Sequence, residues 1–357
     1  MNFELSDEGR MLQDGLRRFL ANAYDATGRT EAADAPGGFA PRIWSGLAEM
    51  GVIGALFREE VGGFGGTGFD IALVFEEMGR AGAVDPLLDT GILGGGLLAA
   101  CGAEIDGVID GTVQIAVAMG EPGGRYDPMR VATKATPDGD GWRLDGRKAV
   151  VVNAPAADRV LVTARDGDRI GLYEVAPSTL DLRAYPLVGG GMAAEVTLDG
   201  APATRLSDDA SDLLRAAIAR ATLAQCAEAL GLMEAIRALT TDYLRTRKQF
   251  GRPIGTFQVL QHRMADLLIE IEQARSAVIN LAGHVDGPDR DRHVAATKNL
   301  VSEVARLVVE EAIQMHGGIG MTQEYDLGQL AKRLSMVEHR FGDAMHHMQR
   351  FIALTAA

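Results

Sequence analysis

The sequence predicts a multidomain α+β protein with a helical N-terminal domain (1–112), a middle β-barrel domain (113–205) and a C-terminal four-helix bundle (206–357). Two observations carry this prediction. Apolar residues recur at spacings of three and four in the first and last parts, as they do on one face of a helix. Between these parts, short β-rich runs are separated by Asp-Gly and Pro turns. A chain of 357 residues with 47% hydrophobic content can bury a substantial core in several coupled domains.

Three segments of the N-terminal part have the apolar spacing of helices. The first, LSDEGRMLQDGLRRFLANAY, repeats Leu12, Leu16 and Leu20 at intervals of four residues. The second begins at Pro41, a residue type favoured in the first helical turn, and the third is FDIALVFEEMGRAG. Between the second and third lies a run of five glycines within residues 62–68. No strand precedes this run and its spacing matches no phosphate-binding motif, so we expect a loop that uses the backbone freedom of glycine.

The middle part consists of short runs rich in β-forming residues. Examples are TVQIAVAMGEP, WRLDGRKAVVV, RVLVTARDG and IGLYEVAP. The segment PDGDGW has the composition of a hairpin turn. These runs lie between helical segments, which predicts a small all-β domain inserted between two helical ones.

The C-terminal part has the pattern of long helices, whose lengths favour a four-helix bundle. The first helix ends in the 240s, and the others lie near 256–285, 290–316 and 323–354. Gly251 and Pro253 are expected to end the first helix, and Thr256 can cap the second.

The last of these helices contains the run RLSMVEHRFGDAMHHMQR, residues 333–350. On one continuous helix, His339, Asp343 and His347 would share a face because they are four residues apart. A di-iron bundle needs paired Glu-x-x-His motifs from two helices, and Asp343-x-x-His346 has no counterpart on another helix. We therefore expect no metal site and place His339 and His347 on a helix surface or at an interface.

The chain is acidic, with 35 Lys and Arg against 49 Asp and Glu and a net charge of −14. Such a chain repels nucleic acid and anionic membranes, so neither is an expected partner. Its two cysteines, Cys101 and Cys226, do not make a disulfide framework or a zinc motif. No apolar signal region and no apolar run of about 18 residues is visible, so we expect no transmembrane helix and a cytoplasmic location.

Against this acidic background, the stretch YLRTRKQFGRPIGTFQ carries Arg245, Arg247, Lys248 and Arg252 close together. Guanidinium groups beside a helix N-terminus form an anion site suited to a pyrophosphate. The alternative is a basic turn exposed to solvent, and the chemistry of these residues alone leaves both interpretations open.

This stretch and QMHGGIGMTQEY, residues 314–325, resemble two signatures of the flavin-dependent acyl-CoA dehydrogenases. The order of helices, β domain and helices matches that family as well, so the resemblance covers essentially the whole chain. Together with FGDAMHH, these motifs look closest to the small-subunit type of pimeloyl-CoA dehydrogenase. The resemblance implies the acyl-CoA dehydrogenase fold and FAD-dependent α,β-dehydrogenation of an acyl-CoA thioester. It also implies an electron-transfer flavoprotein or a similar electron acceptor.

Several residues match family positions that contact FAD: Arg247, Phe250, Gln258, Gln314, Gly317 and Gly318. The resemblance assigns to Arg247 the FAD pyrophosphate of a neighbouring subunit, to Phe250 the same cofactor and to Gln258 the adenosine side. Gln314 and the backbone at Gly317 and Gly318 would hold the adenine dinucleotide end. These roles fit the residue types, because arginine offers a bidentate fork and glycine lets a ligand approach the backbone closely.

Two further segments resemble those that line the flavin ring and the thioester. In MGEPGGRYDP, Met119 and Gly120 lie at cofactor positions, with Gly120 in place of a threonine. In GRKAVVVNA, Val150 replaces a tryptophan that flanks the flavin, and Val152 replaces a threonine whose hydroxyl reaches the flavin N5 edge. The ring contacts are therefore reduced, while the adenine-side residues are intact.

The catalytic carboxylate of the family lies at the start of the last helix. Alignment of the terminal helix places Asp343 at that position, with Glu338 as the fallback. The base position used by some relatives falls at Ala221, which has no carboxylate. Asp343 is thus the candidate base, and a plain helix cap after Gly342 is the other interpretation.

These residues lead to three hypotheses about function. The first is one subunit of a heteromeric acyl-CoA dehydrogenase, paired with a paralogous chain. The second is a catalytically silent partner that supplies only adenine-side contacts and interface. The third is a self-sufficient homotetramer.

Overall fold

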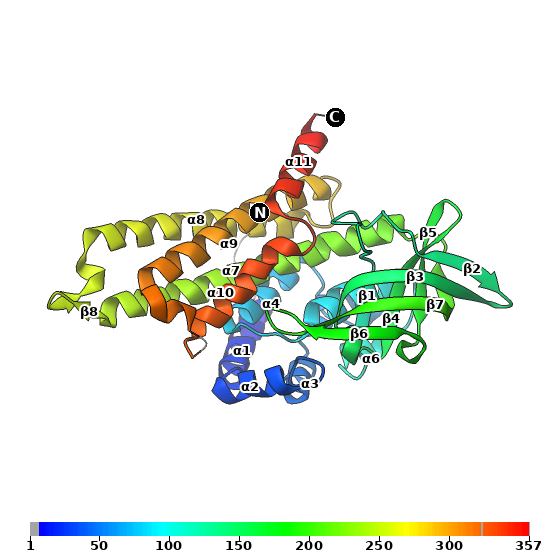
Figure 1. The fold of residues 1–357 in the computed structure, drawn as a ribbon, viewed down its shortest axis with the longest axis horizontal. Coiled ribbons are helices and arrows are strands. Elements are labelled where there is room, and N and C mark those ends of the chain that lie inside the picture. Colours follow the sequence, from blue (N-terminus) through cyan, green and yellow to red (C-terminus); the bar gives the residue numbers. More distant parts are fainter. Residues whose placement is uncertain (1–6, 323, 357) are drawn as a thin grey trace. The chain divides into compact units, whose positions relative to one another are not determined.

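The computed structural model describes residues 7–322 and 324–356 of the chain. The chain forms two compact units, which we call the helical unit and the barrel unit. The helical unit comprises Met1–Tyr24, Gly68–Ala83 and Thr222–Ala357, and the barrel unit comprises Asp25–Thr67 and Val84–Ala221. The predicted fold class is confirmed, because helical segments precede and follow a β-barrel in the sequence (Figure 1). The division into three domains at residues 112 and 205 stays a prediction.

The barrel unit contains a seven-stranded sheet within the described residues. Its strands are β1 (Ile115–Ala118), β2 (Lys134–Asp138), β3 (Gly141–Val152), β4 (Arg159–Asp166), β5 (Arg169–Val175), β6 (Asp181–Pro186) and β7 (Met192–Ser207). Their order is β1-β4-β2-β3-β7-β5, and β4 also pairs with β5, so the path from β4 to β5 closes into a ring. Closure pairs strand edges that an open sheet would expose. The predicted hairpin turn is confirmed, since Asp138 pairs with Gly141 and Gly139 between them has a φ of 59°.

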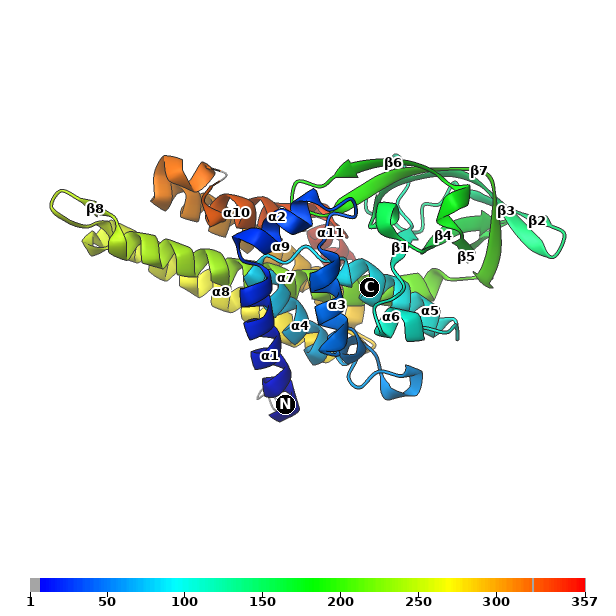
Figure 2. The ribbon, with the colours of Figure 1, turned by 90° about the horizontal axis from the view of Figure 1, so that it is seen from below.

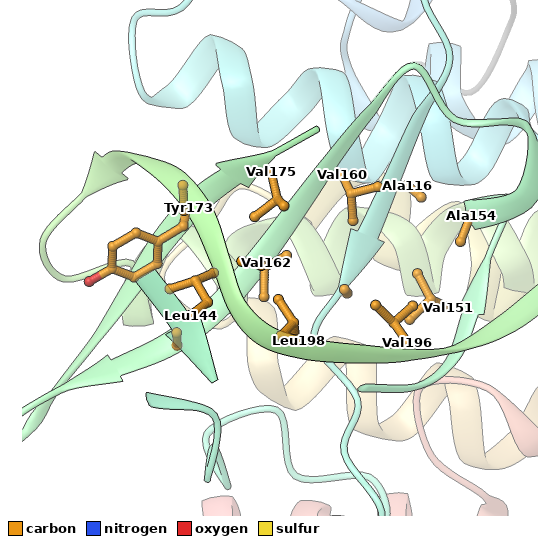
Figure 3. Packing of buried hydrophobic residues seen from close by; sticks show 14 of the residues in the cluster. Ala116, Leu144, Val151, Ala154, Val160, Val162, Tyr173, Val175, Val196 and Leu198 are labelled. Atoms are coloured by element: carbon orange, nitrogen blue, oxygen red, sulfur yellow. The ribbon is translucent and has the colours of Figure 1, made fainter. Parts of the chain in front are cut away.

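Small apolar side chains fill the interior of the barrel. Strand β4 contributes Val160, Val162 and Ala164, which are alternate residues and therefore point to the same face. Figure 3 shows the two valines together with Leu144 from β3 and Val196 from β7, two strands that do not pair with β4. This packed interior explains why the predicted runs are rich in valine and alanine.

Short helices complete the barrel unit. They are α2 (Ala26–Asp34), α3 (Pro41–Glu49), the π-helix η3 (Leu88–Gly95), α5 (Gly96–Ala100), α6 (Asp106–Ile109) and the 3₁₀ turns η1 (Gly54–Leu56), η2 (Glu59–Val61), η4 (Ala154–Ala156) and η5 (Pro177–Thr179). In the glycine-rich loop, the amides of Gly63, Gly65 and Gly66 donate to carbonyls of residues 55–58. A Cβ at Gly63 would lie 2.2 Å from the Phe57 carbonyl oxygen. The glycines therefore serve a tight loop, as expected, and these three amides are occupied within it.

Seven helices and a small hairpin are described in the helical unit. The helices are α1 (Asp7–Ala23), α4 (Gly68–Ala81), α7 (Ser211–Thr246, from residue 222), α8 (Gln258–His284), α9 (Arg290–His316), α10 (Asp326–Met336) and α11 (Ala344–Thr355). The remaining elements are β8 (Lys248–Gln249), β9 (Arg252–Pro253) and the 3₁₀ turns η6 (Ile254–Thr256), η7 (Gly317–Met321) and η8 (Val337–His339). Within the described part of the chain, no helix has the length and hydropathy needed to span a bilayer.

The predicted four-helix bundle is present as α7, α8, α9 and α10. Glu234 on α7 pairs with Arg275 on α8 at 2.7 Å, and Glu228 on α7 pairs with Arg333 on α10. Helices α8 and α9 run side by side in both views (Figures 1 and 2). All four side chains are at most 26% exposed, so removing either partner of a pair would leave a shielded charge without a counter-charge.

Helix α4 crosses α7 at a point where both helices carry a glycine. A Cβ at Gly79 would lie 1.9 Å from the Glu228 carbonyl oxygen, and a Cβ at Gly231 would lie 1.9 Å from that of Glu76. Because no side chain fits at either position, the two backbones touch. The crossing fixes α4, which comes from the N-terminal part of the sequence, against the C-terminal bundle.

The prediction of one terminal helix over 323–354 is wrong. Helix α10 ends at Met336, and α11 begins only at Ala344. The break is made by Phe341 and Gly342, whose φ angles of 59° and 114° are incompatible with a right-handed helix. Consequently, residues 339, 343 and 347 do not share a face of one helix.

The predicted boundary between α7 and α8 also needs correction. Helix α7 ends at Thr246, before Gly251, and Gly251 (φ 80°) lies in the turn of the β8–β9 hairpin instead. Thr256 does not cap α8: its hydroxyl donates to the Pro253 carbonyl oxygen at 2.8 Å. The N-cap position of α8 is Phe257, which makes no side-chain capping bond.

Candidate cofactor residues and candidate base

After α7, the basic stretch folds into a hairpin, in which β8 and β9 are joined by a loop of two residues. Phe250 and Gly251 both have positive φ angles, 53° and 80°, as a tight hairpin turn with a right-handed twist requires. Phe250 is 90% exposed, and Arg247 is exposed at the start of the hairpin. The arginine backbone is fixed, since its amide donates to Tyr243 and its carbonyl accepts from Ile254. The hairpin therefore presents a guanidinium and an aromatic ring outward on a rigid backbone.

The predicted adenine-side residues of α8 and α9 lie at neighbouring helix ends. Gln258 is the exposed first residue of α8, and Gln314 is exposed in the last turn of α9. Arg263 and Glu311, one turn further into each helix, form a two-bond ion pair at 2.7 and 3.0 Å. This pair holds the ends of the two helices together.

The loop after α9 is anchored by a stack of rings. His316 stacks on Tyr243 of α7 with 4.5 Å between ring centroids, and its Nε2 lies 3.2 Å from the Tyr325 hydroxyl. Its Nδ1 lies 2.8 Å from the Ala312 carbonyl oxygen, which makes Nδ1 the donor and Nε2 the acceptor. Burial lowers the pKa of His316, partly offset by the Ala312 bond, which is consistent with a neutral ring.

Gly317 and Gly318 follow this stack and are open to a ligand. A Cβ added at either glycine would meet no atom within 4 Å, and Gly317 has a φ of 69°. The backbone therefore faces open space, as close approach of a dinucleotide requires. Arg247 is exposed one helical turn after Tyr243, the residue that stacks on His316. The residues of this end therefore fit a cofactor that carries a pyrophosphate.

In the barrel unit, the loop with Met119 and Gly120 follows β1 and is held by a buried ion pair. The Lys148 Nζ lies 2.7 Å from Glu121 Oε1, and Lys148 has no exposed surface. The same carboxylate accepts hydrogen bonds from the amides of Ala132 and Thr133. Burial lowers the pKa of Lys148 to about 8 against the opposing effect of Glu121.

Burial also acts on the partner carboxyl group, in the opposite sense. It disfavours the charged form of Glu121, but hydrogen bonds from Lys148 and Thr133 outweigh it and hold the Glu121 pKa below its usual range. The amide of Ala149 donates to Gly120 at 2.9 Å, which joins the loop to β3. Met119 and Gly120 are thus placed by one buried charge pair and one backbone bond.

Val150 lies in a β-bulge of β3. The register against β7 shifts between Lys148 and Val151, and Val150 has a φ of 52°, an uncommon value for a β-branched residue. Its side chain is 56% exposed, and its amide donates to Glu195 at 3.2 Å. Glu195 also accepts from the Tyr185 hydroxyl at 2.8 Å. The bulge turns position 150 outward, where a valine presents less surface than a tryptophan.

Asp343 is the N-cap of α11. Its Oδ1 accepts from the His346 amide at 2.7 Å, and the side chain is partly exposed. In the described residues, the second oxygen, Oδ2, has no hydrogen bond. The cap interpretation is therefore correct for one oxygen, and the role of base stays a prediction for the other. The fallback, Glu338, lies in η8, and Ala221 is buried on α7.

Sequence reasoning missed the residues that hold the Asp343 segment. Lys298 on α9 has no exposed surface and donates to the Val337 carbonyl oxygen and to Gln225. His347 was expected on a helix surface or at an interface, but within the chain it is only 3% exposed, whereas His339 is exposed. A lysine in an otherwise apolar helical stripe (Val294, Ala295, Val301) was the signal that could have indicated a buried charge.

The described residues contain no group of three or more His, Cys, Asp and Glu side chains arranged to hold a metal ion. The candidate residues thus form three groups. The hairpin and the ends of α8 and α9 form one, and Asp343 lies beside the other half of α9. Lys298 and Gln314 are separated by roughly 24 Å along that helix at 1.5 Å per residue. Met119, Gly120 and Val150 form the third group in the barrel unit.

The chain is similar to known proteins over most of its length. Residues 6–104 match the family described as acyl-CoA dehydrogenase, N-terminal domain, and residues 212–345 match acyl-CoA dehydrogenase, C-terminal domain. Acyl-CoA dehydrogenase IpdE2 of Mycobacterium tuberculosis is 32% identical over 334 residues, which cover 92% of this chain and 91% of that protein.

Two solved structures are similar over nearly the whole chain. The Tcur3481-Tcur3483 steroid ACAD G363A variant has a TM-score of 0.90 at 30% identity and 98% coverage of both chains. The ChsE4-ChsE5 complex from Mycobacterium tuberculosis has a TM-score of 0.91 at 24% identity, with 100% of this chain and 99% of that chain covered.

Proposed function

Because the chain belongs to the acyl-CoA dehydrogenase family, we propose that it works as one subunit of a hetero-oligomeric FAD-dependent acyl-CoA dehydrogenase, with a paralogous chain as partner. The reaction class is α,β-dehydrogenation of an acyl-CoA thioester. An electron-transfer flavoprotein or a similar protein would reoxidise the cofactor.

The observation that carries the proposal is the contrast between the two sets of cofactor residues. Arg247, Phe250 and the open glycine loop offer the groups that a pyrophosphate and a nucleoside need. At the ring-lining positions, Val150 is a small exposed side chain and Val152 has no hydroxyl group. A chain with this contrast would serve a FAD molecule shared with a second subunit. The ChsE4-ChsE5 structure supports the proposal as an example of a similar fold in a two-protein complex.

A bound FAD would supply the acceptor for the hydride that leaves the β-carbon of the substrate. Removal of the α-proton needs a base, and Asp343 is the residue of this chain that we assign to this role. The cap bond fixes Oδ1 and leaves Oδ2 to take the proton. Positioned base catalysis is typically worth about 10²- to 10⁴-fold in rate. Because aspartate is one methylene shorter than glutamate, the substrate would lie about 1.5 Å closer to the backbone than with a glutamate base.

The assembly is tested by expressing the chain alone and together with any acyl-CoA dehydrogenase paralogue encoded beside it. The proposal expects a nearly colourless protein alone and a yellow complex that is bleached by an acyl-CoA. One full FAD per chain with turnover and no partner would overturn it in favour of the homotetramer. A yellow, active complex that is unaffected by Asp343→Asn would favour the silent partner.

A further inference from the structure

The peptide that carries Asp343 has an unusual backbone. Phe341 has a φ of 59° and Gly342 a φ of 114°, immediately before the candidate base. A bulky residue in the left-handed region is strained and persists only where its surroundings fix it. The groups that hold this turn also set the direction of the Asp343 side chain.

Three side chains bind backbone carbonyls of this segment. Lys298 donates to Val337 at its start, and Asn299 Nδ2 donates to Ala344 at its end, at 2.9 Å. In the middle, the Nε2 of His347 lies 2.9 Å from the carbonyl oxygen of Phe341. Only this last bond acts on the left-handed turn itself.

His347 also packs directly against the glycine of the turn. A Cβ at Gly342 would lie 2.6 Å from the His347 Nε2 and 2.6 Å from the His346 Cδ2. The turn therefore needs glycine for two reasons, namely its φ angle and the presence of the imidazole rings. Ring and turn form a single packed unit at the start of α11.

The hydrogen bond defines the protonation of the ring. A carbonyl oxygen only accepts, so Nε2 must carry the hydrogen. Nδ1 is buried and has no partner among the described residues. Burial, together with nearby Lys298 and against the effect of the Phe341 bond, lowers the pKa of His347 to about 4 and keeps the ring neutral. A leucine here would avoid the cost of the unpaired nitrogen, so the bond to Phe341 is what the imidazole contributes.

We propose that His347 is a positioning residue: its Nε2–H bond to the Phe341 carbonyl fixes the turn and thereby aims the Asp343 carboxylate. The inference rests on the proposed role of Asp343 as the base. His347 itself takes no part in proton transfer. Its loss should reduce the rate of α-proton removal without weakening cofactor or thioester binding, because a displacement of about 1 Å can cost up to 10²-fold in rate.

The test compares His347→Leu with His347→Gln, whose side-chain amide can donate from nearly the same place as Nε2. His339→Leu serves as the matched control, since this histidine lies in the same segment but is exposed. Each variant is prepared in the enzyme form that binds FAD, alone or with its partner. Hydrogen exchange of the peptide 337–347 reports the turn without any substrate. Single-turnover flavin bleaching by butyryl-, octanoyl- and 3-phenylpropionyl-CoA reports the chemistry, and FAD content and melting temperature report folding.

The expected result for His347→Leu is faster exchange of this peptide and about 10- to 100-fold slower bleaching, with the acyl-CoA Kd and FAD content within twofold of wild type. Glutamine should restore both readouts, and the control should change neither. Unchanged exchange in the leucine variant would overturn the inference, as would faster exchange with normal bleaching. A rate loss that follows FAD content and is not restored by glutamine would show a structural role only. If Asp343→Asn bleaches at the wild-type rate, the proposed base is wrong, independently of the exchange result.

Discussion

The ammonium group of Lys148 lies 2.7 Å from the carboxylate of Glu121, and both side chains are buried beneath the loop that carries Met119 and Gly120. The pair joins β3 to the loop that follows β1. The Glu121 carboxylate also accepts hydrogen bonds from the amides of Ala132 and Thr133, so the conformation of the loop depends on a carboxylate whose counter-charge is buried with it.

Lys148→Met should destabilise the isolated chain by roughly 3–5 kcal/mol, because it leaves the Glu121 carboxylate buried without a counter-charge. Urea unfolding followed by circular dichroism measures the change. The matched control is Arg143→Met, which breaks an exposed pair with Asp138 at 2.7 Å and should cost less than about 1 kcal/mol. Equal losses in the two variants would contradict this account of the loop.

Arg247→Ala should lower FAD retention in the assembled oligomer several-fold. Loss of a charge-assisted hydrogen bond to a pyrophosphate costs roughly 1.5–3 kcal/mol. The measurement is the flavin content after extensive dialysis, with Lys332→Ala on the exposed side of α10 as control. Flavin content equal to that of the control would exclude Arg247 from the cofactor site.

Restoring the family residues at the flavin ring should increase the FAD occupancy of the isolated chain. Val150→Trp and Val152→Thr together would supply the missing aromatic surface and hydroxyl. The bulge already turns position 150 outward, with the side chain 56% exposed, so the larger residue has room. Isothermal titration calorimetry with FAD measures the affinity and the occupancy of the isolated chain. No gain over the wild-type chain would mean that these two positions do not limit binding.

Asp343→Asn should bind FAD and acyl-CoA normally and lose about 10²-fold or more in the rate of flavin bleaching. Folding should be nearly unaffected, because asparagine caps a helix about as well as aspartate. If bleaching continues at the wild-type rate, Glu338→Gln is the next variant to measure. Should that variant also be fully active in a working heteromer, this subunit supplies no base.

Acid should destabilise the folded chain through His347. The folded pKa of about 4 lies below the ordinary value near 6.5, so between these pH values the unfolded chain takes up a proton that the folded chain does not. The stabilisation that comes from the neutral ring is therefore fully present above pH 6.5, and it is lost progressively as the pH falls toward 4. Between pH 6.5 and 4, the free energy of unfolding of His347→Gln should fall by up to about 3 kcal/mol less than that of the wild type. Parallel stability curves for the two proteins over this range would refute it.

The elements with long apolar repeats could be predicted from the sequence, and those set by single residues could not. The segment 290–316 was predicted as a helix and is α9, because its stripe is long and ends at two glycines. The break at Phe341 was missed, since a phenylalanine with positive φ is stabilised by a histidine six residues away rather than by local propensity. The hairpin after Thr246 was missed because Gly251 and Pro253 indicate only that a helix ends. Its strands are two residues long, and the positive φ of Phe250 is not a local preference of phenylalanine.

The candidate site shows the same difference. Arg247, Gly317 and Gly318 could be assigned cofactor roles from their motifs alone, and they are exposed or open in the structure. These roles stay predictions. Lys298 could not be assigned, because its role depends on a carbonyl 39 residues later in the chain. A buried polar contact between distant segments leaves no local pattern in the sequence.

The glycine crossing of α4 and α7 has a consequence for how the chain is made. Helix α4 leaves the ribosome long before Thr222, the first residue of its partner segment in the helical unit. At 5–20 residues per second, α4 waits on the order of 10 s with the face that packs on α7 and α8 uncovered. During that interval the barrel unit can fold, since every strand of its sheet ends by Ser207. The helical unit closes last, so a nascent chain stalled before α7 would expose an apolar helix to chaperones and proteases.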